Sequence, residues 1–190
     1  GKPTVAVMCG VGKVNAAICA QVLVDLFEVD CIINVGVGGA VDKGLRVGDI
    51  VISKDSVQYD MDGSAFGHLR GEIPNMDVTF FPADERLVQL AKDAAERVGA
   101  NALVGRVMTA DLGVDSPALK QELTELFGGA CVEMEGAAIG QAAYINKIPY
   151  IVIRSISDNA DGDLVETYQN NFQLSVVNAA KMTLGIVEHY

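Results

Sequence analysis

Short apolar runs alternate with longer segments whose apolar residues recur about every 3.6 positions. The short runs predict strands over residues 4–8, 31–35, 49–53, 57–59 and 103–109. The longer segments predict helices over residues 13–27, 83–98, 117–127 and 164–188, the last long enough to contain a break. The stretch 63–82 is rich in glycine and proline and is expected to be a long irregular excursion. This alternation predicts an α/β protein with a three-layer sandwich, formed by residues 1–190 as one domain.

The region from residue 130 to residue 161 holds the most informative pattern. An apolar run at 130–132 and a second at 150–153 are each followed by acidic residues, and a helix of small residues is predicted between them. We interpret this unit as a strand–helix–strand parallel crossover, which opens its ligand crevice at the carboxyl ends of the strands. Glu135 and Asp158 are therefore expected in one cleft, where two carboxylates suit acid–base chemistry on a small polar molecule.

Structural roles for these side chains are equally compatible with their spacing. Asp158 also suits the cap of the turn that follows it. Glu133 and Glu135 also favour the N-terminus of the predicted helix, where the helix dipole stabilises acidic groups. Two further residues, considered again below, have structural interpretations as well. Arg154 suits a structural ion pair with a nearby acid, and Phe66 suits packing on its own domain.

The composition of the chain limits the kinds of molecule that are expected to bind to it. The chain has 14 basic and 25 acidic residues, a net charge of −11, which argues against nucleic-acid and membrane partners. Four cysteines without a C-x-x-C pair, and two distant histidines, give no pattern for a disulfide framework or a metal site. No run has the length of a membrane span and no signal peptide is visible, so a cytoplasmic location is expected. The sequence begins at Gly1 without a methionine, so an upstream segment is expected to be missing.

Two glycine-rich segments follow predicted strands. Residues 10–12 predict a tight turn into the first helix, and residues 36–39 predict a loop. Neither has the spacing of a P-loop or of the G-x-G-x-x-G dinucleotide fingerprint, so no ATP, NAD or other cofactor is expected. A glycine loop after a buried strand serves either as a sharp turn or as a place where a ligand approaches the backbone closely. Both readings stay open at this point.

Seven segments together resemble one known family. They lie at residues 10–14, 33–39, 47–51, 58–62, 65–67, 132–135 and 154–158, in an order that spans nearly the whole chain. With V-E-M-E and R-S-I-S-D as its most specific motifs, the chain resembles 5′-methylthioadenosine/S-adenosylhomocysteine nucleosidases of the nucleoside phosphorylase superfamily. The resemblance implies a nucleoside phosphorylase-like sandwich with a mixed central sheet, and a homodimer. It also implies a role in methionine salvage through hydrolysis of the N-glycosidic bond that joins adenine to a 5′-thioribose.

The same resemblance implies roles for individual residues. Asp158 would protonate adenine N7 with support from Ser157, and Glu135 would bind the ribose hydroxyls. Arg154 would help to position the attacking water. The implied substrate-binding residues are Met134 beneath the sugar, Glu133 as a support, Val114 at the adenine edge, Gly113, Val11, Val37, Gly38, Phe172, and Phe66 reaching into the site of a second subunit.

Three departures from the family pattern leave alternatives open. Gly113 stands where an aromatic residue often stacks on the purine, and Val37 replaces a hydroxyl residue near the water. The family's water-activating glutamate is expected upstream of Gly1. Hydrolysis of another nucleoside, such as futalosine, and nucleoside binding without turnover therefore remain alternatives. A phosphorylase acting on purine nucleosides is a further alternative, disfavoured because residues 34–37 contain no arginine or serine for phosphate.

Overall fold

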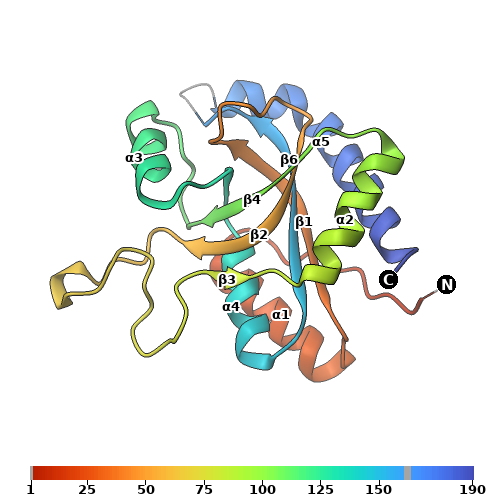
Figure 1. Cartoon of the computed structure of the whole chain (residues 1–190), viewed down its shortest axis with the longest axis horizontal. Coiled ribbons are helices and arrows are strands. Elements are labelled where there is room, and N and C mark those ends of the chain that lie inside the picture. The colour runs from red at the N-terminus through yellow and green to blue at the C-terminus, as the bar shows by residue number, and fades with distance from the viewer. Residues whose placement is uncertain (1, 161–163) are drawn as a thin grey trace.

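A computed structural model describes residues 2–160 and 164–190, and it shows a mixed β-sheet with helices on both faces (Figure 1). The strands are β1 (Ile32–Ala40), β2 (Ile50–Gln58), β3 (Phe81–Pro82), β4 (Ala102–Thr109), β5 (Cys131–Glu133) and β6 (Tyr150–Asp158). The helices are α1 (Lys13–Phe27), the short η1 (Ser64–Phe66), α2 (Glu85–Val98), α3 (Pro117–Phe127), α4 (Gly136–Asn146) and α5 (Leu164–Val187). The predicted α/β sandwich with a mixed central sheet is confirmed.

The sheet is strongly curved. Its strand order is β3-β2-β4-β5-β1-β6, and β2 pairs in addition with β6, so that five strands close into a ring. Strands β2, β4 and β5 run in one direction, whereas β1 and β6 run in the other. The closure brings β6 beside both β1 and β2, so residues far apart in sequence surround one end of β1.

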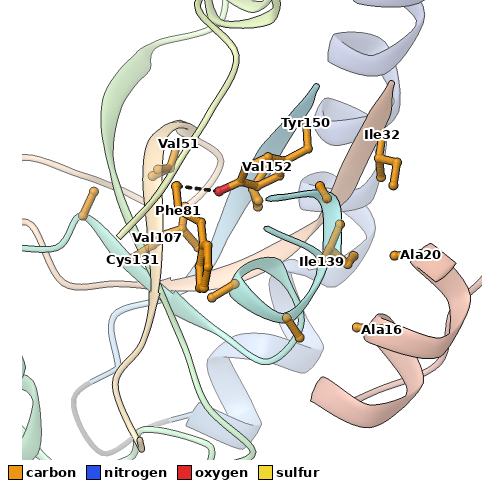
Figure 2. Packing of buried hydrophobic residues seen from close by; sticks show 14 of the residues in the cluster. Ala16, Ala20, Ile32, Val51, Phe81, Val107, Cys131, Ile139, Tyr150 and Val152 are labelled. Carbon is orange, nitrogen blue, oxygen red and sulfur yellow. Dashed lines mark hydrogen bonds between the residues drawn. The ribbon is translucent and has the colours of Figure 1, made fainter. Parts of the chain in front are cut away.

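In the first halves of β2 and β6, alternate residues enter two different hydrophobic cores. Val51 and Val152 pack with Phe81 and Tyr150 on the side of α1 and α4 (Figure 2). Ile52 and its neighbours on β6 face the opposite side, against α2 and α5. A strand that is buried on both faces needs apolar residues at consecutive positions, which explains the continuous apolar runs in the sequence.

Helix α4 lies close to the sheet because its buried face is built from small residues. A Cβ atom on Gly140 would lie 2.7 Å from the hydroxyl oxygen of Tyr150. That hydroxyl donates a hydrogen bond of 2.6 Å to the carbonyl of Phe81 (Figure 2). It also lies 2.9 Å from Ser56 Oγ. The small-residue pattern thus sets how near the N-terminus of α4 comes to the strands that end at the site.

Several predicted elements differ from the structure. Residues 4–8 form no strand, since no described segment pairs with them, and Val5, Val7 and Met8 are exposed. Residues 57–59 are not a separate strand, because β2 continues to Gln58 across a register shift between Ser53 and Asp55.

The observed bounds of the helices agree with the predicted ones in some cases and differ in others. The observed bounds of α1 and α3 equal the predicted ones, and α5 runs unbroken to Val187. Asp84 is the N-cap of α2 instead of part of its first turn, and its carboxylate accepts the backbone N–H of Leu87 at 2.9 Å. Among the described residues, no helix combines the length and apolar character needed to cross a membrane.

The predicted parallel crossover between residues 130 and 158 is wrong. β5 runs antiparallel to β1, and β1 runs parallel to β6, so the two strands of the unit point in opposite directions with β1 between them. β5 is only three residues long and begins beside the C-terminal end of β1. The residues that follow β5 therefore stay close to the C-terminal half of β6, despite the opposite strand directions.

Candidate active site

A cavity of about 1310 Å³ lies between the N-terminal segment, strand β1 and the ends of β5 and β6. Glu135, two residues after β5, and Asp158, the last residue of β6, both line it. Residues 2–11 also line it. The two carboxylates expected to share a cleft therefore do so.

In the wall of the cavity, Arg154 and Glu133 form a buried ion pair. Each side chain is 1% exposed, and both Nε and Nη2 of Arg154 donate hydrogen bonds to Glu133 Oε2. Nη2 also donates to Asn34 Oδ1 at 2.7 Å. Burial alone would lower the pKa of Arg154, but the carboxylates of Glu133 and Glu135 outweigh it and raise that pKa. The guanidinium is therefore charged and held in one orientation.

Glu133 also organises the turn that carries Glu135. Its carboxylate accepts the backbone N–H of Glu135 at 3.0 Å and that of Gly136 at 2.7 Å. Thr109, at the end of β4, donates its hydroxyl to Glu133 and accepts the backbone N–H of Ala137 at 2.8 Å. These bonds satisfy the free N–H groups at the start of α4 with a buried charge.

The Glu135 carboxylate is held on both oxygens. Oε1 accepts the backbone N–H of Gly12 at 2.9 Å, and Oε2 lies 3.4 Å from Arg154 Nη2. Burial raises the pKa of Glu135, while the Gly12 hydrogen bond and the charge of Arg154 act in the opposite direction. The side chain remains 18% exposed, so it is open to a bound molecule.

Asp158 is buried and hydrogen-bonded at the end of β6. Ser157 donates its hydroxyl to Asp158 Oδ2 at 2.8 Å, and the backbone N–H of Ala160 donates to Oδ1 at 2.9 Å. Only 3% of the residue is exposed, although it lines the cavity. A carboxyl group in this position can exchange a proton with a ligand that enters the cavity.

The glycines at residues 36–39 are part of strand β1 instead of the predicted loop. A Cβ atom on Gly36 would lie 2.6 Å from Arg154 Nη1, and one on Gly39 would lie 2.7 Å from Asp158 Oδ1. A Cβ atom on Gly38 would lie 2.9 Å from the carbonyl oxygen of Val132. These glycines thus make room for polar side chains and backbone of the neighbouring strands.

Most of the residues proposed from the sequence are gathered at this cavity. The eleven that line it are Asp158, Glu135, Ser157, Arg154, Met134, Glu133, Val114, Gly113, Val11, Val37 and Gly38. Phe66 is not among the described lining residues; it is 87% exposed on η1, in a segment that extends away from the sheet (Figure 1). The side chain of Phe172 lies outside the described residues.

The sequence interpretation missed three supporting groups: Asn34, Thr109 and the backbone N–H of Gly12. Asn34 is a polar residue within an otherwise apolar predicted strand, and that signal was present. Thr109 is the last residue of β4, as Asp158 is the last residue of β6. A polar residue at the end of a strand is a weaker signal in the sequence. The contact of Gly12 with Glu135 joins residues 123 positions apart and has no local signature.

Known proteins with similar sequences and structures show the family of the chain. The sequence profile described as "Phosphorylase superfamily" matches residues 1–188. A 5′-methylthioadenosine/S-adenosylhomocysteine nucleosidase of Exiguobacterium is 38% identical over 94% of this chain and 77% of its own length. One from Haemophilus influenzae is 35% identical over 99% of this chain and 82% of its own.

Two solved structures are similar in fold. The nucleosidase of Neisseria meningitidis in complex with methylthio-immucillin-A has a TM-score of 0.93 at 35% identity, over 96% of this chain and 80% of its own. The futalosine hydrolase of Helicobacter pylori also has a TM-score of 0.93, at 31% identity, over 96% and 78%. The chain belongs to the phosphorylase superfamily and, within it, to the family of 5′-methylthioadenosine/S-adenosylhomocysteine nucleosidases.

Proposed function

We propose that this protein is an N-glycosidase that hydrolyses 5′-methylthioadenosine and S-adenosylhomocysteine, releasing adenine and the 5′-thioribose. The observation that carries this function is the shared cavity of Glu135 and Asp158, built by a chain of this family. One carboxylate is partly open and held by Gly12 and Arg154, whereas the other is buried beside Ser157. Two carboxyl groups in such different surroundings suit two different tasks.

In the proposed reaction, the bond between C1′ and adenine N9 breaks while a water oxygen bonds to C1′. The proton that this water loses passes to the solvent, and Asp158 regains a proton from the solvent after each turnover. Asp158 gives its proton to N7, so adenine leaves as a neutral base, and Ser157 holds the carboxyl group in place. Ionised Glu135 accepts hydrogen bonds from the ribose hydroxyls, and its negative charge lies near the cationic sugar of the transition state. Each of the two carboxyl groups therefore acts on one part of the nucleoside.

The remaining residues are proposed to shape the pocket around the substrate. Met134 packs beneath the sugar, and the backbone of Val114 binds the edge of adenine beside Gly113, which leaves room above the base. Arg154 helps to position the water, with its guanidinium fixed by Glu133 and Asn34. Val11, Val37 and Gly38 complete the wall, and Phe172 is proposed to contact the substrate from α5.

Adenine release tests this function in the full-length protein. We expect adenine from methylthioadenosine at a rate that does not depend on phosphate, and Asp158→Asn should lower kcat by about 10²–10⁴-fold while leaving nucleoside binding largely intact. Asp93→Asn, on the distant helix α2, is the matched control. Unchanged turnover in Asp158→Asn would refute the assignment, and ribose 1-phosphate formation would make the protein a phosphorylase. Turnover of futalosine alone, or binding without turnover, would favour those alternatives.

A homodimer is part of the proposed function. Val14, Ile18, Val22 and Leu26 recur at every fourth position of α1, and all four are exposed. Such an apolar stripe on a helix surface is typical of an interaction site. We infer that a second copy of the chain covers it, because Val11, three residues before the stripe begins, is exposed and lines the cavity. Phe66, exposed on η1, is proposed to reach into the partner's site.

The cellular setting is proposed on chemical grounds. All four cysteines, within the described residues, are free thiols, which suits a reducing compartment such as the cytoplasm. Hydrolysis of methylthioadenosine would supply adenine and a thioribose for methionine salvage. We propose that residues 1–190 act together as one nucleosidase domain, since residues from both halves line the cavity.

A further inference from the structure

The position of one carboxylate oxygen of Glu135 is set by a hydrogen bond from the N-terminus of a distant helix, α1. Its side chain leaves the start of α4 and reaches the N-terminus of α1, where the backbone N–H of Gly12 donates to Oε1. Gly12 has a φ angle of 95° and forms the last residue before α1, so the turn depends on glycine at this position. The location of this turn therefore sets the location of the Glu135 carboxylate.

Three charged residues hold that turn, and we call them the clamp: Lys13, Asp60 and Asp111. The backbone N–H of Lys13 donates to Asp111 Oδ1 at 2.8 Å, and its ammonium group donates to Asp60 Oδ1 at 2.7 Å. Asp60 Oδ2 accepts the backbone N–H of Asp111 at 3.2 Å. The clamp thus joins α1 to the turns after β2 and β4 in a closed set of bonds.

The clamp touches the site only through the backbone. Among the cavity-lining residues that the structure describes, none of the three appears. The Lys13 and Asp60 side chains are 21% and 28% exposed, and an ion pair with that much solvent access contributes little to folding stability. Loss of one clamp side chain should therefore leave the protein folded, which makes its effect on the site measurable.

We propose that Lys13, Asp60 and Asp111 are positioning residues that fix the Glu135 carboxylate for the ribose hydroxyls by holding the Gly12 N–H against it. This role rests on the proposed function, since Glu135 is the residue proposed to bind the sugar. A carboxylate that binds two hydroxyls must be placed within about 0.5 Å of its working position. A misplacement of about 1 Å can lower a rate by about 100-fold even when its cause lies outside the site.

The test compares Asp60→Asn and Lys13→Met with the controls Asp93→Asn and Lys92→Met on α2, all in the full-length protein. We expect the clamp variants to lower kcat/KM for adenine release by about tenfold, and Lys13→Arg to restore most of it. In a Glu135→Gln background, Asp60→Asn should change kcat/KM by less than about twofold, because the residue on which it acts is already altered. An equal loss in both backgrounds, or no loss in either, would overturn the positioning role.

A second measurement does not depend on activity. Amide hydrogen exchange at Gly12, followed by NMR, should accelerate by about tenfold in Asp60→Asn and stay unchanged in Asp93→Asn. Unchanged exchange at Gly12 in Asp60→Asn would refute the clamp. If the wild-type protein released no adenine while exchange at Gly12 still responded to Asp60→Asn, the proposed function would fail and the clamp would stand.

Discussion

Glu133 and Arg154 form an ion pair from which water is almost wholly excluded, in the wall of the candidate active site. Glu133 follows the end of β4 by 24 residues and Arg154 lies in the middle of β6, yet each side chain is 1% exposed. Glu133 also accepts the backbone N–H groups that begin α4. The same carboxylate therefore binds Arg154 in the sheet and positions the turn that carries Glu135.

Breaking this pair should strongly destabilise the fold. Glu133→Gln leaves the buried Arg154 charge without its main partner, and we expect the free energy of unfolding to fall by about 3–5 kcal/mol. Urea denaturation measures the loss. Glu122→Gln, which breaks the exposed pair with Arg70, is the control and should cost about 1 kcal/mol or less. Equal effects in the two variants would contradict a buried, charged Arg154.

A methyl group on Gly39 should displace the proposed proton donor. The added Cβ atom would lie 2.7 Å from Asp158 Oδ1 and 3.0 Å from the Cβ atom of Ala160. We expect Gly39→Ala to lower kcat by about 100-fold, with a loss of about 1–3 kcal/mol in stability from overpacking. In the control Gly44→Ala, the described contact of the new atom is with the Asp42 carboxylate, at 3.2 Å. Normal kcat in Gly39→Ala would show that the position of Asp158 is unimportant.

The raised pKa of Glu135 predicts how stability depends on pH. Burial is the main cause, opposed by Gly12 and Arg154 and assisted by the charge of Glu133. The folded protein then binds the Glu135 proton more tightly than the unfolded chain does. The neutral carboxyl group therefore stabilises the folded state below the ordinary pKa of 4.5. This stabilisation is lost as the pH rises through the higher pKa that Glu135 has in the folded protein.

Glu135→Gln removes this titration. We expect the variant to gain stability relative to the wild type between pH 4 and pH 7, with the difference growing as the pH rises. Denaturant unfolding at both pH values measures it, and Asp93→Asn serves as the control. A difference that shrinks toward neutral pH would mean that the pKa of Glu135 is lowered.

The apolar stripe on α1 predicts the effect of a charge at the proposed dimer interface. In a twofold dimer each substitution acts twice, so Ile18→Lys should place two like charges in one apolar contact and yield monomers. The fold should persist because Ile18 is 59% exposed in the chain alone. Sedimentation measures the change, and Leu184→Lys on α5 is the exposed control. Dimers in Ile18→Lys, or monomers in the wild type, would refute this interface.

Local sequence patterns were enough to predict much of the fold. The bounds of α1 and α3 follow from the spacing of apolar residues, with Pro117 at the start of α3. The strand cores of β1 and β6 follow from continuous apolar runs, because neighbouring residues of these strands face different cores. Glu135 and Asp158 were candidates because each follows such a run.

Long-range contacts determined what local patterns could not. Residues 36–39 are strand instead of loop because β6 pairs with them and because the side chain of Arg154 occupies the space beside Gly36. Residues 4–8 have strand-like composition but no described partner, and a strand needs hydrogen bonds from another segment. The direction of β5 relative to β6 likewise depends on β1, which lies between them.

The amino-acid order alone thus indicated most of the elements, the family and two acidic residues of the candidate site, because local patterns and short motifs carry these. The folded chain alone established that Gly12 holds Glu135 and that Glu133 neutralises Arg154. Both contacts join residues from separate elements, and their geometry follows from the closure of the sheet and the packing of α1 against α4. The spacing of residues along the sequence does not predict these two contacts.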